Sequence, residues 1–252
     1  MVLTLTHPAV DRIMALTLPA ILRRQRQRHC TIVLVIACWL PATRAQAFTQ
    51  ARIGQSTPLA SASNLLSITL VSDTSLYADT GSAITLSGLG SASSASGSTV
   101  PLLAATGGGG NNGELLFGSQ AVWSSTGTLT CKLVDGQTLA ADISYQFAFI
   151  VINPAGDQAA QTITIAASGS AALAPQVMVS DGGNVLGVAG GRAPLLTIVA
   201  AFSTAFVTQT TPLVSVINYI ILFLRPNANI ARDSRIAISG LNAATNSQKS
   251  SM

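Results

Sequence analysis

Two stretches of sequence decide the fold, because the chain contains nearly the same pattern twice. Residues 48–70 are FTQARIGQSTPLASASNLLSITL, and residues 202–224 are FSTAFVTQTTPLVSVINYIILFL. When the two stretches are aligned with a shift of 154 positions, nine residues of the first are identical to those of the second. They are Phe48, Ala51, Gln55, Thr57, Pro58, Leu59, Ser61, Asn64 and Leu70. After a gap of two residues five more identities follow: Ser82, Ile84, Ser87, Gly88 and Leu89 match Ser234, Ile236, Ser239, Gly240 and Leu241. A period of this length is that of a domain rather than of a solenoid unit.

The repeat predicts how the chain is organised. Residues 1–47 are expected to be a signal peptide, and residues 48–168 a complete β-sandwich repeat. Residues 169–200 are rich in Ala, Gly and Ser and are expected to be a linker with short strands. Residues 201–252 are then the truncated start of a second repeat.

Composition favours an all-β protein. Apolar residues make up 48% of the chain and charged residues only 9%, so a core can form and the chain is not of the disordered class. Aromatic residues are scarce, whereas small residues and β-branched runs are common. That combination is typical of many short strands joined by turns.

The formal net charge of +4 comes from the N-terminal segment. Seven basic and eight acidic residues follow position 48, a balance of −1. The basic residues before it are Arg12, Arg23, Arg24, Arg26, Arg28 and Arg44, against the single Asp11. The rest of the chain has no cluster of Lys and Arg residues that would neutralise the phosphates of a nucleic acid. Nucleic-acid binding is therefore disfavoured.

The N-terminal segment has the order of a secretory signal. Residues 23–28 are Arg-rich, residues 31–40 are apolar, and Ala45-Gln46-Ala47 is a small-x-small cleavage site. The apolar run is too short to span a bilayer. Initiation at Met14 gives a more ordinary leader length, and a mitochondrial presequence is the alternative because the segment is Arg-rich and nearly free of acidic residues. Cleavage after Ala47 places the start of the first copy at the new N-terminus.

Alternation of apolar and polar residues predicts strands within residues 66–70, 84–87, 129–133, 144–153 and 162–165. The strand at 144–153 is apolar on both faces, so it is expected to be central and covered on both sides. Turn signals recur every 8–12 residues or so, and no stretch has a sustained helical period. This spacing predicts an antiparallel β-sandwich. The glycines and asparagines of residues 107–113 predict a flexible loop.

One strand pattern resembles a known family. It consists of Leu139, Tyr145, Phe147, Phe149, Val151 and Asn153, followed by Pro154-Ala155-Gly156. This is similar to the F strand of fibronectin type III and related immunoglobulin-like domains, and it implies a hydrogen bond from the tyrosine back to the preceding turn. The repeat, with Ile84-Thr85-Leu86-Ser87-Gly88-Leu89, also resembles tandem β-sandwich repeats of large secreted or surface proteins of algae and other protists. That resemblance implies a structural role and assigns no residue roles.

Several kinds of catalytic site are excluded after position 47. Both histidines, His7 and His29, precede it, which removes Ser-His and Cys-His nucleophiles and histidine metal sites. Cys30 and Cys38 leave with the predicted leader. Cys131 alternates with apolar residues and is expected to be a buried core residue rather than a reactive thiol.

Acidic residues offer one candidate site. Residues 76–83, LYADTGSA, resemble the active-site turn of aspartic proteases around Asp79, but such enzymes need two aspartates sharing a proton. The corresponding segment of the second copy, residues 231–235, lacks the motif, so only a homodimer supplies the second aspartate. Asp and Gly are also ordinary turn residues. Glu114 is the only glutamate, which excludes a glycosidase built on two glutamates. We therefore predict no catalytic, cofactor or metal site.

Residues 193–224 contain no charged residue over 32 positions, which raises a membrane span as an alternative. Pro212 and the polar residues of the segment argue against a span, and the repeat explains the same residues as the start of a domain. The positions of Ser67 and Thr69 become Ile221 and Phe223 in the second copy. A face that is polar in the first copy is thus apolar in the second and has to be covered.

These observations predict a secreted or cell-surface structural or adhesive protein without catalytic activity. The expected partners are cell-wall or matrix polysaccharide or protein. Three alternatives stay open: an aspartic-type protease using Asp79, a membrane-tethered surface protein, and a carbohydrate-binding module. Trp123, the only tryptophan after position 47, is expected in the core rather than on a sugar-binding platform.

Overall fold

The computed structural model describes residues 45–94, 96–104 and 111–241. The predicted signal peptide, apart from its last three residues, and the glycines at 107–110 lie outside the described residues. Within the described residues the protein is all-β, as predicted, with one short helix and one 3-10 turn.

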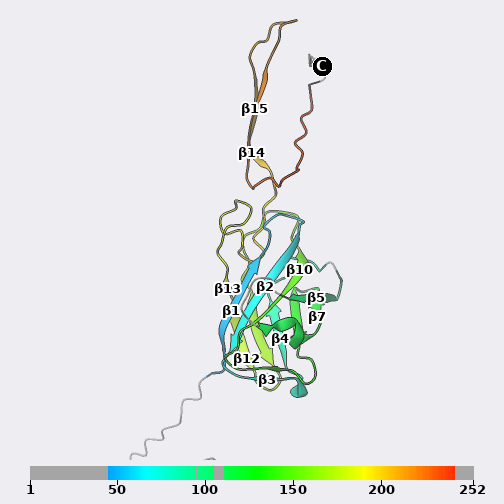
Figure 1. Cartoon of the computed structure of the whole chain (residues 1–252), viewed down its shortest axis with the longest axis vertical. Coiled ribbons are helices and arrows are strands. Elements are labelled where there is room, and N and C mark those ends of the chain that lie inside the picture. Colours follow the sequence, from blue (N-terminus) through cyan, green and yellow to red (C-terminus); the bar gives the residue numbers. More distant parts are fainter. Residues whose placement is uncertain (1–44, 95, 105–110, 242–252) are drawn as a thin grey trace, which may run out of the picture. The chain divides into compact units, whose positions relative to one another are not determined.

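The strands are short and follow one another closely along the chain (Figure 1). In order, the elements are β1 (Phe48–Gln55), β2 (Ser63–Ser72), β3 (Leu76–Tyr77), η1 (Ala78–Thr80), β4 (Ala83–Ser87), β5 (Thr99–Ala104), β6 (Asn111–Asn112), α1 (Gly113–Phe117), β7 (Gln120–Ser124), β8 (Thr128–Lys132), β9 (Thr138–Leu139), β10 (Tyr145–Ile152), β11 (Thr164–Ser168), β12 (Leu173–Val177), β13 (Val179–Ser180), β14 (Phe202–Gln209) and β15 (Ile220–Pro226).

Eleven of these strands form one sheet, in the order β12-β11-β4-β8-β7-β5-β10-β2-β1-β13, with β6 beside β10. Strand β5 joins the two halves: Thr99–Pro101 pair with β7, and Leu102–Ala104 pair with β10. The two ends of the path, β12 and β13, are separated along the chain by Met178 alone. The sheet therefore curls until its ends meet, and its halves are continuous through β5 where the sequence predicts two separate packed sheets.

Alternate residues of the strands fill the interior, as the period of two requires. On β2 the buried apolar residues are Leu66, Ile68 and Leu70, which confirms the half-buried strand predicted there. Trp123 on β7 and Cys131 on β8 lie in the same core, also as predicted.

Strand β10 crosses the middle of the sheet and contributes the largest core side chains. Phe147 and Phe149 are fully buried, and the ring of Phe117 meets that of Phe147 edge-on at 5.4 Å. The prediction that this strand is covered on both faces is correct for Ala148 and wrong for Ile150, which is 39% exposed.

The tyrosine at the start of β10 makes the bond that its sequence pattern implied. The Tyr145 hydroxyl accepts a hydrogen bond from the Ala140 backbone N–H at 3.0 Å and donates to the Thr138 carbonyl at 3.4 Å. This fixes the turn that leads into β10.

Two segments expected to be loop or linker contain ordered elements. The end of the predicted 107–113 loop forms β6 and the start of α1, where the Asn112 side chain accepts a hydrogen bond from the Glu114 backbone N–H and caps the helix. Within residues 169–200, β12 pairs with β11, and β13 pairs with β1 in parallel. Leu195 in the same segment is fully buried.

The uncharged segment 193–224 contains β14, and β15 follows from Ile220 to form a hairpin with it. In the part of the chain that the structure describes, no helix is long and apolar enough to cross a membrane.

Candidate functional site

The second copy of the repeat folds into a hairpin with the register of the first. In the first hairpin (β1 and β2), Phe48 pairs with Ser72 and Ala51 with Leu70. In the second hairpin (β14 and β15), the residues 154 positions later pair in the same way, Phe202 with Pro226 and Ala205 with Leu224. Both hairpins carry an irregularity two residues after the first pair. The same sequence pattern thus produces the same local geometry twice.

An asparagine organises the turn of the first hairpin. The Asn64 side-chain oxygen accepts hydrogen bonds from the backbone N–H groups of Ser56 and Thr57, at 3.1 and 3.3 Å. Its Nδ2 donates to Gln55 Oε1 at 2.9 Å. The Thr57 hydroxyl accepts from the Leu59 N–H at 3.2 Å, so the turn is held by side chains within it.

The second hairpin repeats these bonds atom for atom. Asn218 Oδ1 accepts from the N–H groups of Thr210 and Thr211, each at 3.1 Å, and Asn218 Nδ2 donates to Gln209 Oε1 at 2.9 Å. The Thr211 hydroxyl accepts from the Leu213 N–H at 3.2 Å. The residue shared by both turns, Ser61 in the first and Ser215 in the second, has a positive φ of 57° and 60° respectively.

The surroundings of the two hairpins differ. In the first, β10 pairs along β2, and β13 pairs along β1. Figure 1 shows β1, β2 and β10 side by side in the domain. Among the described residues, β14 and β15 pair only with each other. Both outer edges of the second hairpin therefore present unpaired backbone groups.

Burial separates the two groups of phenylalanines. In the domain, Phe48, Phe117, Phe147 and Phe149 are 0–3% exposed; in the second hairpin, Phe202, Phe206 and Phe223 are 40%, 50% and 47% exposed. Large aromatic side chains gathered on a surface are typical of a binding or assembly face rather than of ordinary surface composition.

The outward face of the second hairpin is apolar where that of the first is polar. Phe206 stands at the position of Arg52, and Phe223 at that of Thr69. The two rings stack, with centroids 4.4 Å apart and planes 14° from parallel. Ile221 at the position of Ser67 extends the face along β15. The structure therefore brings together on one face the substitutions that the sequence analysis singled out.

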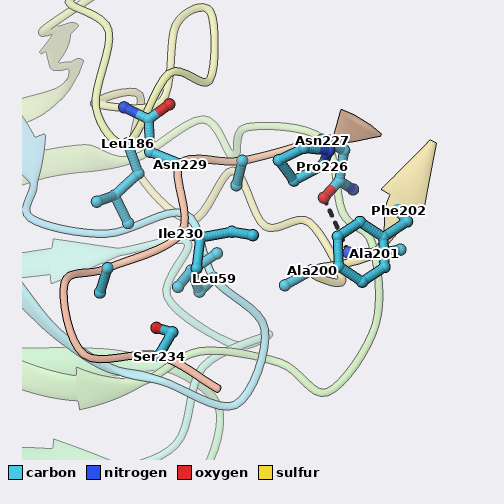
Figure 2. Close-up of a pocket in the computed structure, with 12 residues that line it drawn as sticks. Leu59, Leu186, Ala200, Ala201, Phe202, Pro226, Asn227, Asn229, Ile230 and Ser234 are labelled. Atoms are coloured by element: carbon cyan, nitrogen blue, oxygen red, sulfur yellow. Dashed lines mark hydrogen bonds between the residues drawn. The ribbon is translucent and has the colours of Figure 1, made fainter. Parts of the chain in front are cut away.

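A pocket of about 370 Å³ lies at the base of the second hairpin (Figure 2). Leu59, Leu186 and Ile230 line it together with Phe202, and Ala201 N–H donates a 2.9 Å hydrogen bond to the Asn227 side chain beside it. None of its lining residues is titratable. The pocket offers mainly apolar contact, and its one hydroxyl group, that of Ser234, has no acid or base among the other lining residues.

The candidate aspartate lies on a short exposed turn. Asp79 is in η1, where the Thr80 hydroxyl donates to the Tyr77 carbonyl at 2.9 Å and Gly81 ends the turn with φ 69°. A hollow of about 200 Å³ beside it is lined by no other carboxylate. An aspartic-protease site needs a second aspartate that shares a proton with the first, and the lining of this hollow supplies none.

Cys131, the only cysteine among the described residues, is free and buried. Cys131 is fully buried on β8, and burial raises the pKa of its thiol from 9.0 to about 12. Among the described residues there is also no group of three or more His, Cys, Asp or Glu side chains placed to hold a metal ion.

The sequence analysis missed the polar cluster behind the first hairpin. Gln55 Nε2 donates to the carbonyls of Gly191 and Leu196, at 2.9 and 2.8 Å, and Asn64 Nδ2 also donates to Asn153 Oδ1 at 2.8 Å. The signal available in the sequence was the identity of Gln55 and Asn64 in both copies.

Comparison with models of known protein families and with characterised proteins finds no match to this chain.

Proposed function

We propose that this chain is a non-catalytic structural or adhesive protein, secreted or displayed at the cell surface and built from immunoglobulin-like or fibronectin-like β-sandwich repeats. The observation that carries the proposal is the second hairpin: three half-exposed phenylalanines on two strands with free edges. An apolar, uncharged β surface of this kind lowers its free energy by contact with another macromolecule.

The chemistry of the exposed face favours a protein partner over a polysaccharide. Phe206 and Phe223 stack on each other, and Ile221 lies beside them, so the centre of the face offers mainly apolar contact, with the Thr208 side chain opposite Ile221. A sugar surface demands polar groups to satisfy its hydroxyls. The free strand edges supply backbone groups that a protein strand satisfies.

Fractionation of the source cells tests the proposal. With an antibody against the chain, we expect the protein in the medium or in the insoluble extracellular layer, beginning at Phe48 by N-terminal sequencing and intact mass. Replacing Phe206, Ile221 and Phe223 by the first-copy residues Arg, Ser and Thr is expected to shift the protein from the insoluble layer to the medium. A cytosolic protein that retains residues 1–47 contradicts the proposal.

The enzyme alternative has its own test. If Asp79 acts in acid proteolysis, purified protein cleaves a denatured protein substrate at acidic pH, and Asp79→Asn abolishes that cleavage. We expect no cleavage above the background of the matched Asp135→Asn protein, because the hollow beside Asp79 is lined by no second carboxylate.

Carbonate extraction separates the membrane-tethered alternative from the one proposed. Release of the chain into the supernatant supports a peripheral or soluble extracellular protein. Retention in the pellet favours a tether.

A further inference from the structure

We propose that the second hairpin is an acceptor for an extended strand of a protein partner, which adds antiparallel to β15. The partner strand has the chemistry of β10: bulky apolar residues at alternate positions, ending in an asparagine. This inference rests on the proposed function, since it names the kind of partner that the exposed hairpin takes.

The first hairpin shows the complete assembly within the same chain. Strand β10 pairs antiparallel with β2 from Tyr145 opposite Leu70 to Ile152 opposite Ser63. One residue beyond β10, the Asn153 amide closes the pairing: its Nδ2 donates to the carbonyls of Thr57 and Leu59, at 3.1 and 2.9 Å.

The second hairpin keeps the groups that receive this asparagine. Thr211, Leu213 and Asn218 are identical to Thr57, Leu59 and Asn64, and the hydrogen bonds inside the two turns match. An asparagine of an incoming strand therefore finds the same two carbonyls and the same side-chain amide. In the first hairpin that amide contact is the 2.8 Å bond from Asn64 Nδ2 to Asn153 Oδ1.

The apolar face that β2 shares with its neighbour β10 is also present in the second hairpin. Leu66, Ile68 and Leu70, which β10 helps to bury completely, correspond to Ile220, Leu222 and Leu224. The latter are 37% exposed each and remain branched aliphatic side chains. Alternate apolar residues of an added strand extend this face sideways, as Phe147 and Phe149 stand beside Ile68 and Leu66 in the first.

Along residues 220–224, the edge of β15 carries none of the devices by which proteins block strand addition. Residues 220–224 contain no charge, no proline and no bulge, and Arg225 and Pro226 come only at the strand's end. In the described remainder of the chain, residues 227–241 form no strand along this edge. Among the described residues, no third strand pairs with the outer edge of β15.

A labelled peptide tests the proposal directly. The probe is residues 144–154, Ser-Tyr-Gln-Phe-Ala-Phe-Ile-Val-Ile-Asn-Pro, with a fluorescein and two lysines added at its N-terminus for solubility. Fluorescence anisotropy with the full chain is expected to show saturable one-to-one binding. A peptide with the Asn153→Ala change is expected to bind at least tenfold more weakly, and a scrambled peptide not at all.

Variants of the chain locate the binding. Asn218→Ala and Leu222→Arg are each expected to weaken the peptide at least tenfold, whereas Val214→Arg, in the exposed turn, leaves binding unchanged. Equal binding to wild type and Leu222→Arg overturns the proposal, since the peptide then exchanges with β10 of the domain or sticks elsewhere. Because the Asn153→Ala change lies in the peptide, its effect is free of any folding defect in the protein.

Three further outcomes decide between this inference and the proposed function. A stable dimer by sedimentation velocity that excludes the peptide overturns the strand acceptor in favour of a second copy on the hairpin. A chain that lies in the extracellular layer but fails to bind the peptide also overturns the acceptor, and leaves the proposed function standing. A cytosolic chain that binds the peptide through the hairpin supports the acceptor and rejects the location.

Discussion

Asn64 and Asn153 join their side-chain amides across 89 residues of sequence: Asn64 Nδ2 donates to Asn153 Oδ1 at 2.8 Å. Both residues are buried, and both are fully engaged with the turn of the first hairpin. This contact ties the start of β2 to the end of β10. A buried amide pair of this kind is strong when complete and expensive when broken, because each remaining partner loses its bond in a low-dielectric interior.

Replacing Asn64 by Ala is therefore expected to lower the free energy of unfolding by about 2–4 kcal/mol. The change removes the acceptor of the Ser56 and Thr57 N–H groups and leaves the Gln55 and Asn153 amides without one partner each. Urea unfolding of the wild type and of Asn64→Ala, followed by circular dichroism, measures this difference in unfolding free energy.

The matched control is Asn218→Ala, which removes the same bonds from the exposed second hairpin. It is expected to change the unfolding free energy of the domain by less than about 0.5 kcal/mol. Equal effects of the two changes contradict the claim that burial behind β10 makes the first network costly to break.

The Tyr145 hydroxyl gives a second stability prediction. Tyr145→Phe removes the acceptor of the Ala140 N–H and the donor to Thr138, while the buried ring stays in place. We expect a loss of about 1–2 kcal/mol. The control is Tyr77→Phe, because Tyr77 is half-exposed. A Tyr145→Phe protein as stable as the wild type shows that water replaces the hydroxyl without cost.

Burial of Cys131 predicts a loss of stability at alkaline pH. Its pKa is raised from 9.0 to about 12 in the folded state, so below pH 9 the thiol is protonated in both states and has no effect. Between pH 9 and 12 only the unfolded chain ionises, and stability falls as pH rises, approaching about 1.4 kcal/mol per pH unit.

The measurement is the difference in unfolding free energy between the wild type and Cys131→Ala. The Cys131→Ala protein is expected to be less stable than the wild type near neutral pH, because the smaller side chain leaves a cavity in the core. Above pH 9 its unfolding free energy is expected to lack the decrease that ionisation of the thiol causes in the wild type. Peptide-level mass spectrometry is expected to find Cys131 unmodified by iodoacetamide at pH 8 until the chain unfolds. A pH-independent difference between the two proteins refutes the assigned pKa.

The sequence allowed the strands of the first copy to be predicted because they carry one apolar face each. The alternation of Leu66, Ile68 and Leu70 with polar residues fixes which side chains enter the core before any partner strand is known. The same logic placed Cys131 inside.

Features set by distant pairing were not predictable in this way. Strands β12 and β13 carry weak alternation and exist because β11 and β1 offer them partners. The exposure of Ile150 depends on what lies over the outer face of the sheet, and a strand's own sequence does not contain that information. Likewise, the presence of the same asparagine in both copies, Asn64 and Asn218, indicated that the residue matters. It did not show that the Asn64 side chain forms a hydrogen bond with Asn153.

The apolar face of the second hairpin gives the last prediction. The chain itself supplies the polar replacements, so we consider the triple change Phe206→Arg, Ile221→Ser and Phe223→Thr, which converts this face to that of the first hairpin. Binding of the dye ANS is expected to fall, since these side chains are half-exposed in the native protein. The unfolding free energy of the domain is expected to stay within about 0.5 kcal/mol of the wild type, because none of the three belongs to the buried core cluster.

The control for this change is Val122→Thr, which removes an exposed apolar residue from β7 of the domain. It is expected to leave dye binding almost unchanged, because a single exposed apolar side chain is ordinary for a protein surface while a contiguous aromatic face is not. If the triple variant binds as much dye as the wild type, this face is already covered in solution. The partner then sits on the stacked pair of Phe206 and Phe223, and sedimentation velocity shows whether that partner is a second copy of the chain.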